Sequence, residues 1–157
     1  MNLRLDYQRK TGILFLLGLV ASLGLTAFVY WSGLSGPFML DDAPNIQNGF
    51  VPNPDWDAIV YTVTHNGSGR LGRSVSMLTF VLTGMQYGLD PWGFKYHNLL
   101  LHLLNGVLLF RFLQLLLPRL DARLGARKVL LIAGATTAAW LLHPLLVSTV
   151  LYAVQRM

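Results

Sequence analysis

Three long apolar segments set the hydrophobic pattern of this chain. The first, Thr11 to Trp31, contains no charged residue, and at about 1.5 Å per residue it can cross a membrane core of roughly 30 Å. The others occupy residues 96–117 and 129–150. We therefore predict an all-α polytopic membrane protein with about three transmembrane helices, at 11–31, 96–117 and 129–150. A cleaved signal peptide is the alternative for the first segment, although its apolar core usually has only about 7 to 15 residues.

Residues 32–95 have a different pattern, and we expect them to form an extracytoplasmic loop with short amphipathic or interfacial helices. They include five of the seven acidic residues of the chain and most of its prolines. Asn53 as a cap and Pro54 as first helical residue predict a helix near 54–65. The mostly apolar run near 74–87 predicts a second helix that is too short to span a membrane. Asp90 and Pro91 then predict a turn.

Basic residues cluster beside the apolar segments, in a leader at 1–10 and a loop at 118–128. The positive-inside rule places both in the cytoplasm, so that residues 32–95 and 151–157 lie outside. We expect an integral protein of a bacterial inner membrane, with a cytoplasmic N-terminus and a periplasmic main loop. The net charge of +5 is thus a topology signal, and we predict the lipid bilayer as a partner and no nucleic acid. The absence of cysteine excludes disulfides and thiolate metal sites.

Two adjacent acids, Asp41 and Asp42, follow the first apolar segment. One carboxylate could act as general base on a hydroxyl or amide acceptor, while its neighbour positions substrate or holds a cation. The alternative is a structural turn, because Asp-Asp-Ala-Pro-Asn is turn-prone sequence. Two acids without further ligands do not define a metal site, so a divalent cation stays an open candidate.

Two arginines, Arg70 and Arg73, lie on a glycine-rich stretch just before the helix expected near 74–87. Guanidinium groups beside the free N–H groups of a helix start suit a phosphate or pyrophosphate. The alternatives are pairing with Asp55 or Asp57, or contact with lipid head groups. Arg156 near the end of the chain is a further candidate cation, or a simple membrane anchor.

Polar residues on the second predicted span share one helix face. Asn98, His102 and Asn105 are spaced by four and three residues. Such side chains serve more often as interhelical hydrogen-bonding groups than as ligands, and both interpretations stay open. His97 lies at the membrane interface, as a substrate-binding or a solvated residue. His143 followed by Pro144 is typical of a helix kink.

Four stretches of this chain, in their order and rough spacing, resemble membrane glycosyltransferases of the GT-C fold. The most similar branch is that of protein O-mannosyltransferase-like proteins, which often carry tetratricopeptide repeats. Each stretch is weakly specific alone, but the four occur in register across nearly the whole chain and are together fairly specific. They are FMLDDAPNI at 38–46, GRSVSMLTF at 72–80, GFKYHNLLLHLLN at 93–105, and LHP at 142–144 with YAVQRM at 152–157.

The resemblance implies that a sugar moves from a polyprenyl-phosphate carrier to a protein or glycan acceptor at the outer membrane face. Asp41 matches the acidic position that the family uses as base or acceptor-positioning group, with Asp42 as its partner. Arg73 matches the basic residue that opens the membrane-facing helix of the loop. From charge alone, we expect the carrier phosphate to be held by Arg70, Arg73 and Arg156. Substrate binding is expected to involve His97, Asn98 and His102.

Members of this family have many more spanning helices than three. We therefore expect the chain to be the N-terminal portion of such an enzyme, or a small relative, working with further transmembrane helices or a partner transferase. The alternative is a non-catalytic membrane module that binds polyprenyl phosphate or a partner transferase. A third hypothesis is a structural membrane protein whose polar stripe only packs helices. No cofactor is required by these patterns beyond the polyprenyl-phosphate-linked sugar donor and the candidate divalent cation.

Overall fold

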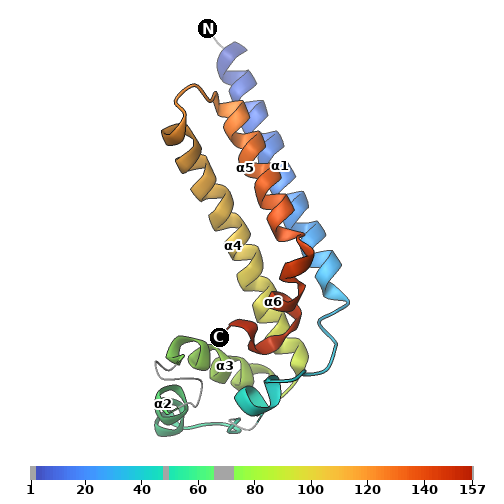
Figure 1. The fold of residues 1–157 in the computed structure, drawn as a ribbon, viewed down its shortest axis with the longest axis vertical. Helices are drawn as coiled ribbons and strands as arrows, with labels where there is room; N and C mark the ends of the chain where they lie inside the picture. Colours follow the sequence, from blue (N-terminus) through green and yellow to red (C-terminus); the bar gives the residue numbers. More distant parts are fainter. Residues whose placement is uncertain (1–2, 48–49, 66–72, 157) are drawn as a thin grey trace. The chain divides into compact units, whose positions relative to one another are not determined.

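The computed structural model describes residues 3–47, 50–65 and 73–156, with side chains from 12 to 155 (Figure 1). Within these ranges every regular element is helical. The longer helices are α1 (Leu3–Trp31), α2 (Trp56–Thr64), α3 (Ser74–Tyr87), α4 (Pro91–Leu120), α5 (Ala126–Leu141) and α6 (Val147–Leu151). Short turns of π-helix or 3₁₀-helix occur at Ala43–Gln47, Pro144–Leu146 and Ala153–Arg156.

Two helices are long and apolar enough to cross a membrane, Gly12–Trp31 of α1 and Pro91–Leu120 of α4. A third span exists if the bent pair formed by Ala126–Leu141 and Pro144–Leu151 is counted as one. These helices fit an integral membrane protein. The span expected over 129–150 corresponds to this bent pair, and its two parts meet at 52° close to the kink expected at His143 and Pro144. Pro144 explains the break, since it donates no N–H and its ring clashes with the preceding turn.

Two predicted helix starts lie at other residues. The expected turn at Asp90–Pro91 is the start of α4, where Asp90 Oδ1 accepts the Trp92 N–H at 2.9 Å and Pro91 takes the first helical position. Asn53 does not cap α2 and has a positive φ of 49°. The cap is Asp55, whose Oδ1 accepts the Ala58 N–H at 2.8 Å. Helix α3 spans the same residues as the second helix expected from the sequence.

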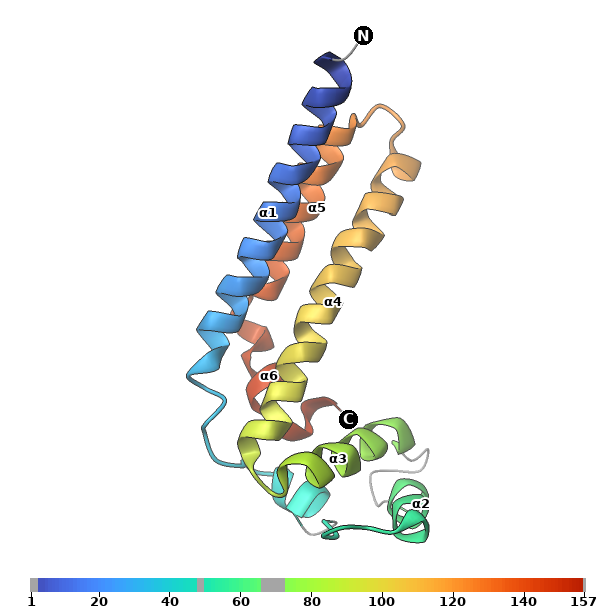
Figure 2. The ribbon, with the colours of Figure 1, turned by 180° about the vertical axis from the view of Figure 1, so that it is seen from behind.

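The chain forms two compact units, of which the first comprises Met1–Val29 and Leu101–Pro144. In this unit the second half of α4 and all of α5 run antiparallel (Figures 1 and 2). Their register is fixed at one end by a hydrogen bond of 3.0 Å between His102 Nε2 and the Leu141 carbonyl. The face that α5 buries repeats every four residues, at Val129, Ala133, Thr137 and Leu141.

Gly106 lets these two helices approach closely. A Cβ atom at this position would lie 2.7 Å from Cδ2 of Leu141, which is itself fully buried. The absence of a side chain at residue 106 therefore has a packing reason.

The second unit comprises Tyr30–Leu100 and Leu145–Met157. Its apolar core draws on the loop after α1, on α3, on the start of α4 and on the C-terminal segment; the buried members are Ile46, Met77, Phe80, Phe94 and Ala153. Phe38 and Val63 pack against this core. Residues separated by more than a hundred positions thus share one core, and this core supports the acidic pair.

Candidate active site

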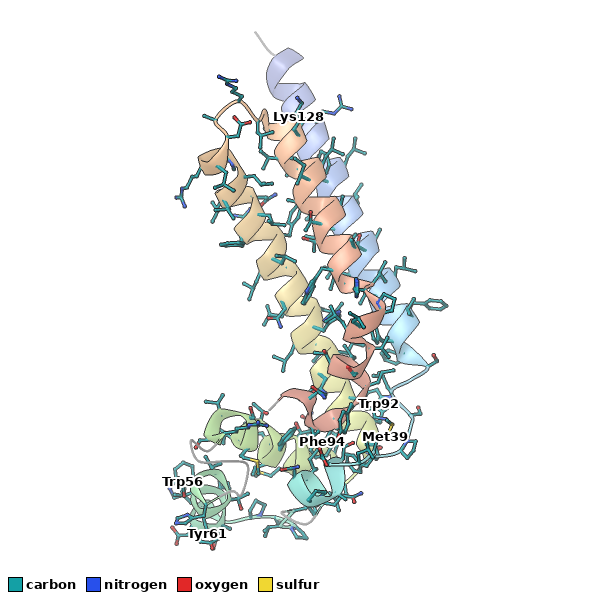
Figure 3. The ribbon with its side chains drawn as sticks, in the orientation of Figure 1. Met39, Trp56, Tyr61, Trp92, Phe94 and Lys128 are labelled. Atoms are coloured by element: carbon teal, nitrogen blue, oxygen red, sulfur yellow. The ribbon has the colours of Figure 1, made fainter. Side chains whose placement is uncertain are left out.

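Asp41 and Asp42 lie on a tight turn that begins at Met39. The Met39 carbonyl accepts the Asp42 N–H at 2.9 Å, and Oδ2 of Asp42 accepts the Met39 N–H at 2.8 Å. Leu40 adopts a φ of 40°, a region that costs a non-glycine residue about 1 to 2 kcal/mol. The side chain of Asp42 thus closes a turn that the backbone alone disfavours. Met39 lies in the same part of the molecule as Trp92 and Phe94 (Figure 3).

Asp42 also binds a segment far along the chain. Its Oδ1 accepts the Val154 N–H at 2.8 Å, and the residue has no exposed surface. Hydrogen bonds to a charged acceptor contribute roughly 1.5 to 3 kcal/mol each. Because both oxygens of Asp42 are engaged, this residue holds the loop and the C-terminal segment together.

A buried cation that the sequence analysis did not single out lies in the same region. Lys95, at 2% exposure, donates from Nζ to the carbonyls of Gly36 at 2.7 Å and Pro37 at 3.0 Å. Its ammonium is also attracted by the carboxylate of Asp42. A buried charge needs such partners, because an unpaired one costs several kcal/mol. Lys95 was predictable, since it precedes Asn98 by three residues and so lies on the polar stripe.

Asp41 differs from its neighbour because it is exposed. Its backbone is fixed on both sides: the N–H donates to Tyr152 Oη at 3.0 Å, and the carbonyl accepts from Asn45 Nδ2 at 2.8 Å. Its carboxylate makes no hydrogen bond within the described ranges 3–47, 50–65 and 73–156. Asp41 therefore presents an accessible carboxylate on a fixed backbone, the arrangement that a general base needs.

A small cavity lies beside Asn45. It has a volume of about 30 Å³ and is lined chiefly by apolar side chains, among them Ile46, Met77 and Phe94. This is room for about one water molecule. Any ligand larger than a water molecule would therefore have to approach Asp41 from its exposed side and not through this cavity.

Asn98 and His102 bind backbone carbonyls. Asn98 is buried, and its Nδ2 lies 3.2 to 3.3 Å from the carbonyls of Val150, Tyr152 and Ala153. Its Oδ1 is buried without a partner in the described part of the chain. These contacts match the structural interpretation of Asn98, whose side chain fixes the segment that reaches Asp42.

His102 is equally buried, and its ring lies 4.8 Å from that of Trp140. Asn105, by contrast, is exposed, so the polar stripe is buried only at its first two members. The predicted role of Asn98 and His102 in substrate binding stays a prediction.

His97 is half-buried. Its Nδ1 lies 2.9 Å from the Gly93 carbonyl, and its ring meets those of Tyr87 and Tyr96 edge to face at 5.7 and 6.1 Å. The aromatic rings and the α4 backbone therefore fix the orientation of the imidazole.

Of the predicted phosphate-binding arginines, Arg73 is exposed and directly precedes α3. Arg70 lies outside the described residues, and so does the side chain of Arg156. The structure thus brings together Asp41, Asp42 and the segment bound by Asn98. The phosphate-binding role of the arginines stays a prediction.

A divalent cation finds little support at the acidic pair. Among residues 3–47, 50–65 and 73–156 no group of three or more His, Asp or Glu side chains could hold a metal ion. Both oxygens of Asp42 already accept backbone N–H groups. A cation would meet one free carboxylate, that of Asp41, which is far fewer ligands than Mg²⁺ or Ca²⁺ takes.

Comparison with known proteins points to one group of enzymes. The chain is 33% identical over 105 residues to Protein O-mannosyl-transferase TMTC2 of Mus musculus, covering 62% of this chain and 12% of that protein. It is also 33% identical over 90 residues to the Homo sapiens protein of the same name, covering 52% and 10%. The chain therefore spans only about an eighth of the length of these relatives. No family model matches, and no solved structure does. The similarity supports a glycosyltransferase-like relationship over about half of the chain.

Proposed function

We propose that this chain supplies the acceptor-activating edge of a GT-C membrane glycosyltransferase, which moves a sugar from a polyprenyl-phosphate carrier to a protein or glycan acceptor at the outer face. The observation that carries the proposal is the difference in burial and hydrogen bonding between the two acids. Asp42 is buried and bound to backbone N–H groups, whereas Asp41 is exposed on a backbone fixed by Tyr152 and Asn45. The partial similarity to protein O-mannosyl-transferases supports mannose as the sugar.

In this proposal Asp41 is the general base. Its carboxylate takes the proton of the acceptor hydroxyl while the acceptor oxygen forms a bond to the anomeric carbon. The bond between that carbon and the carrier phosphate breaks, and the phosphate leaves with the electron pair. Arg73, exposed at the start of α3, is the described candidate for stabilising the phosphate charge. Asp42 acts through Asp41, as the residue that fixes the turn.

The test is mannosyl transfer in membranes that contain the chain together with the further transmembrane helices or the partner transferase that it is expected to need, with radiolabelled polyprenyl-phosphate mannose and a hydroxyl-bearing acceptor peptide. We expect Asp41→Asn to lower the transfer rate by roughly 10² to 10⁴, the usual contribution of a general base. Asp57→Asn is the matched control, because Asp57 is an exposed acid on α2. Membrane fractionation checks that each variant inserts. Normal transfer by inserted Asp41→Asn would end the base assignment.

The alternative function, a non-catalytic module that binds polyprenyl phosphate, has a separate readout. Native mass spectrometry of the purified chain measures retention of the carrier lipid. Retention by a chain that transfers no mannose would favour the binding module over the enzyme.

A further inference from the structure

The first unit has an open hollow between the end of α4 and the start of α5. Its volume is about 440 Å³, within the range of roughly 300 to 1,000 Å³ typical of ligand pockets. Its lining is apolar except for one amide side chain, and consists of Gln114, Pro118, Leu124, Ala126, Val129 and Leu130. The hollow therefore favours a hydrocarbon-like occupant.

The residues around this hollow are basic. Arg119 in the last turn of α4, Arg123 on the connection and Lys128 on the first turn of α5 are exposed, and each directly adjoins a lining residue in the chain; Lys128 is labelled in Figure 3. The acid in this connection is Asp121, and its Oδ1 accepts the N–H of Arg123 at 2.8 Å. Asp121 thus caps its own turn, and the rim keeps a positive net charge.

A further arginine lies beside the amide that lines the hollow. Arg111 Nη1 donates to Gln114 Oε1 at 2.9 Å. Because the side-chain oxygen of Gln114 accepts this bond, the N–H₂ group of the same amide can donate to a ligand in the hollow. The polar side chain of the lining is thus suited to an acceptor-rich ligand.

We propose that this hollow binds one anionic phospholipid, with an acyl chain against the apolar lining and the phosphate at Arg119 and Arg123. Charge complementarity carries the choice of occupant, because the rim is cationic and guanidinium groups bind phosphate oxygens through paired donors. The hollow lies near Leu120, where a helix long and apolar enough to span a membrane ends, and the end of a spanning helix is expected near the lipid head groups. Basic pockets between spanning helices are known to hold such head groups. The proposal is independent of glycosyl transfer.

A phospholipid suits both the apolar lining of the hollow and the basic residues beside it. Free phosphate would satisfy the arginines but would leave the apolar lining without a partner. A zwitterionic lipid would fill the lining but would bring a choline group against the cationic rim. An anionic phospholipid contacts both with favourable chemistry.

The test is native mass spectrometry of the purified chain after incubation with equal amounts of phosphatidylglycerol and phosphatidylcholine. We expect phosphatidylglycerol to be retained preferentially, and Arg119→Gln with Arg123→Gln to lower this retention about tenfold or more. The matched control is Arg9→Gln with Lys10→Gln, which removes the same charge from the other basic cluster and should retain the lipid. Circular dichroism verifies that each variant is helical.

A second variant separates a shaped site from a diffuse charge effect. Ala126→Phe fills the hollow without changing the charge, so it should also lower phosphatidylglycerol retention. Equal retention of the two lipids would overturn the proposal, and so would equal losses in the two double variants or normal retention by Ala126→Phe. Displacement of phosphatidylglycerol by glycerol phosphate at the same concentration would likewise overturn it, because the acyl chain would then contribute nothing.

Discussion

Replacing Lys95 by methionine tests whether the buried ammonium supports the acidic turn. Methionine preserves most of the volume and removes the charge. The change leaves the carbonyls of Gly36 and Pro37 without their donor, and it leaves the buried carboxylate of Asp42 without the attraction of the ammonium. Leaving a buried hydrogen-bond acceptor without its donor costs about 1 to 3 kcal/mol. We therefore expect Lys95→Met to lower the free energy of unfolding by about 2 kcal/mol, the middle of that range.

The assay is unfolding in mixed micelles by titration with a denaturing detergent, followed by circular dichroism. Lys128→Met is the matched control, because Lys128 is exposed and such surface changes stay within about 0.5 kcal/mol. Both proteins are measured without added phospholipid. If Lys95→Met were as stable as Lys128→Met, the ammonium would not contribute to the fold.

A double-mutant cycle identifies the partner of Lys95. If the ammonium and the Asp42 carboxylate stabilise each other, Lys95→Met combined with Asp42→Asn should cost less than the sum of the single changes. Groups that interact directly or through a shared network commonly differ from additivity by about 0.5 to 3 kcal/mol. An additive result would show that Lys95 acts only through the carbonyls of Gly36 and Pro37.

Two further predictions concern the acidic pair and the packing of α4 on α5. Asp42→Asn should lower the free energy of unfolding by about 1 to 3 kcal/mol, since an amide provides one acceptor oxygen where the carboxylate provides two. Asp41→Asn should change it by no more than about 0.5 kcal/mol. Detergent titration measures both variants, and a similar loss in the two would contradict the different roles of the acids. Gly106→Val should cost about 1 to 3 kcal/mol by overpacking against Leu141. Gly18→Val is its control, because a Cβ at Gly18 meets no atom within 4 Å.

The sequence predicts the helices correctly where the length of an apolar segment and its local residue pattern determine the structure. The uncharged run that ends at Trp31 is a helix of spanning length, and Ser74–Tyr87 is a separate short helix. The start of α4 was missed because Asp-Pro is compatible with both a turn and a helix start. The residues after Pro91 decide between them, since they continue as helix.

The break near Pro144 shows a different limit. A proline within an apolar run either kinks a helix or ends it, and neighbouring helices determine which. In this protein α5 ends at Leu141, whose carbonyl binds His102. That contact joins residues far apart in the sequence, and no local pattern contains it.

The same limit applies to the candidate site. Adjacent acids in a chain with 12% charged residues were sufficient to locate the turn. Sequence alone could not separate their roles, because buried Asp42 accepts the N–H of Val154, more than a hundred residues further along the chain. Lys95 lies on the polar stripe and could have been included, since a single lysine in an apolar helix needs a partner.

The C-terminal segment gives the acidic turn its shape. Asn98 binds the carbonyls of Val150, Tyr152 and Ala153, and the same segment offers the Tyr152 hydroxyl to Asp41 and the Val154 N–H to Asp42. Asn98 therefore acts on the acids through this segment, although it does not touch them. A residue of the predicted polar stripe thus has a definite structural part in the candidate site. The backbone of Asp41 is held by the hydroxyl of Tyr152, which lies more than a hundred residues away in the sequence; the acceptor activation that we propose would require such a fixed backbone.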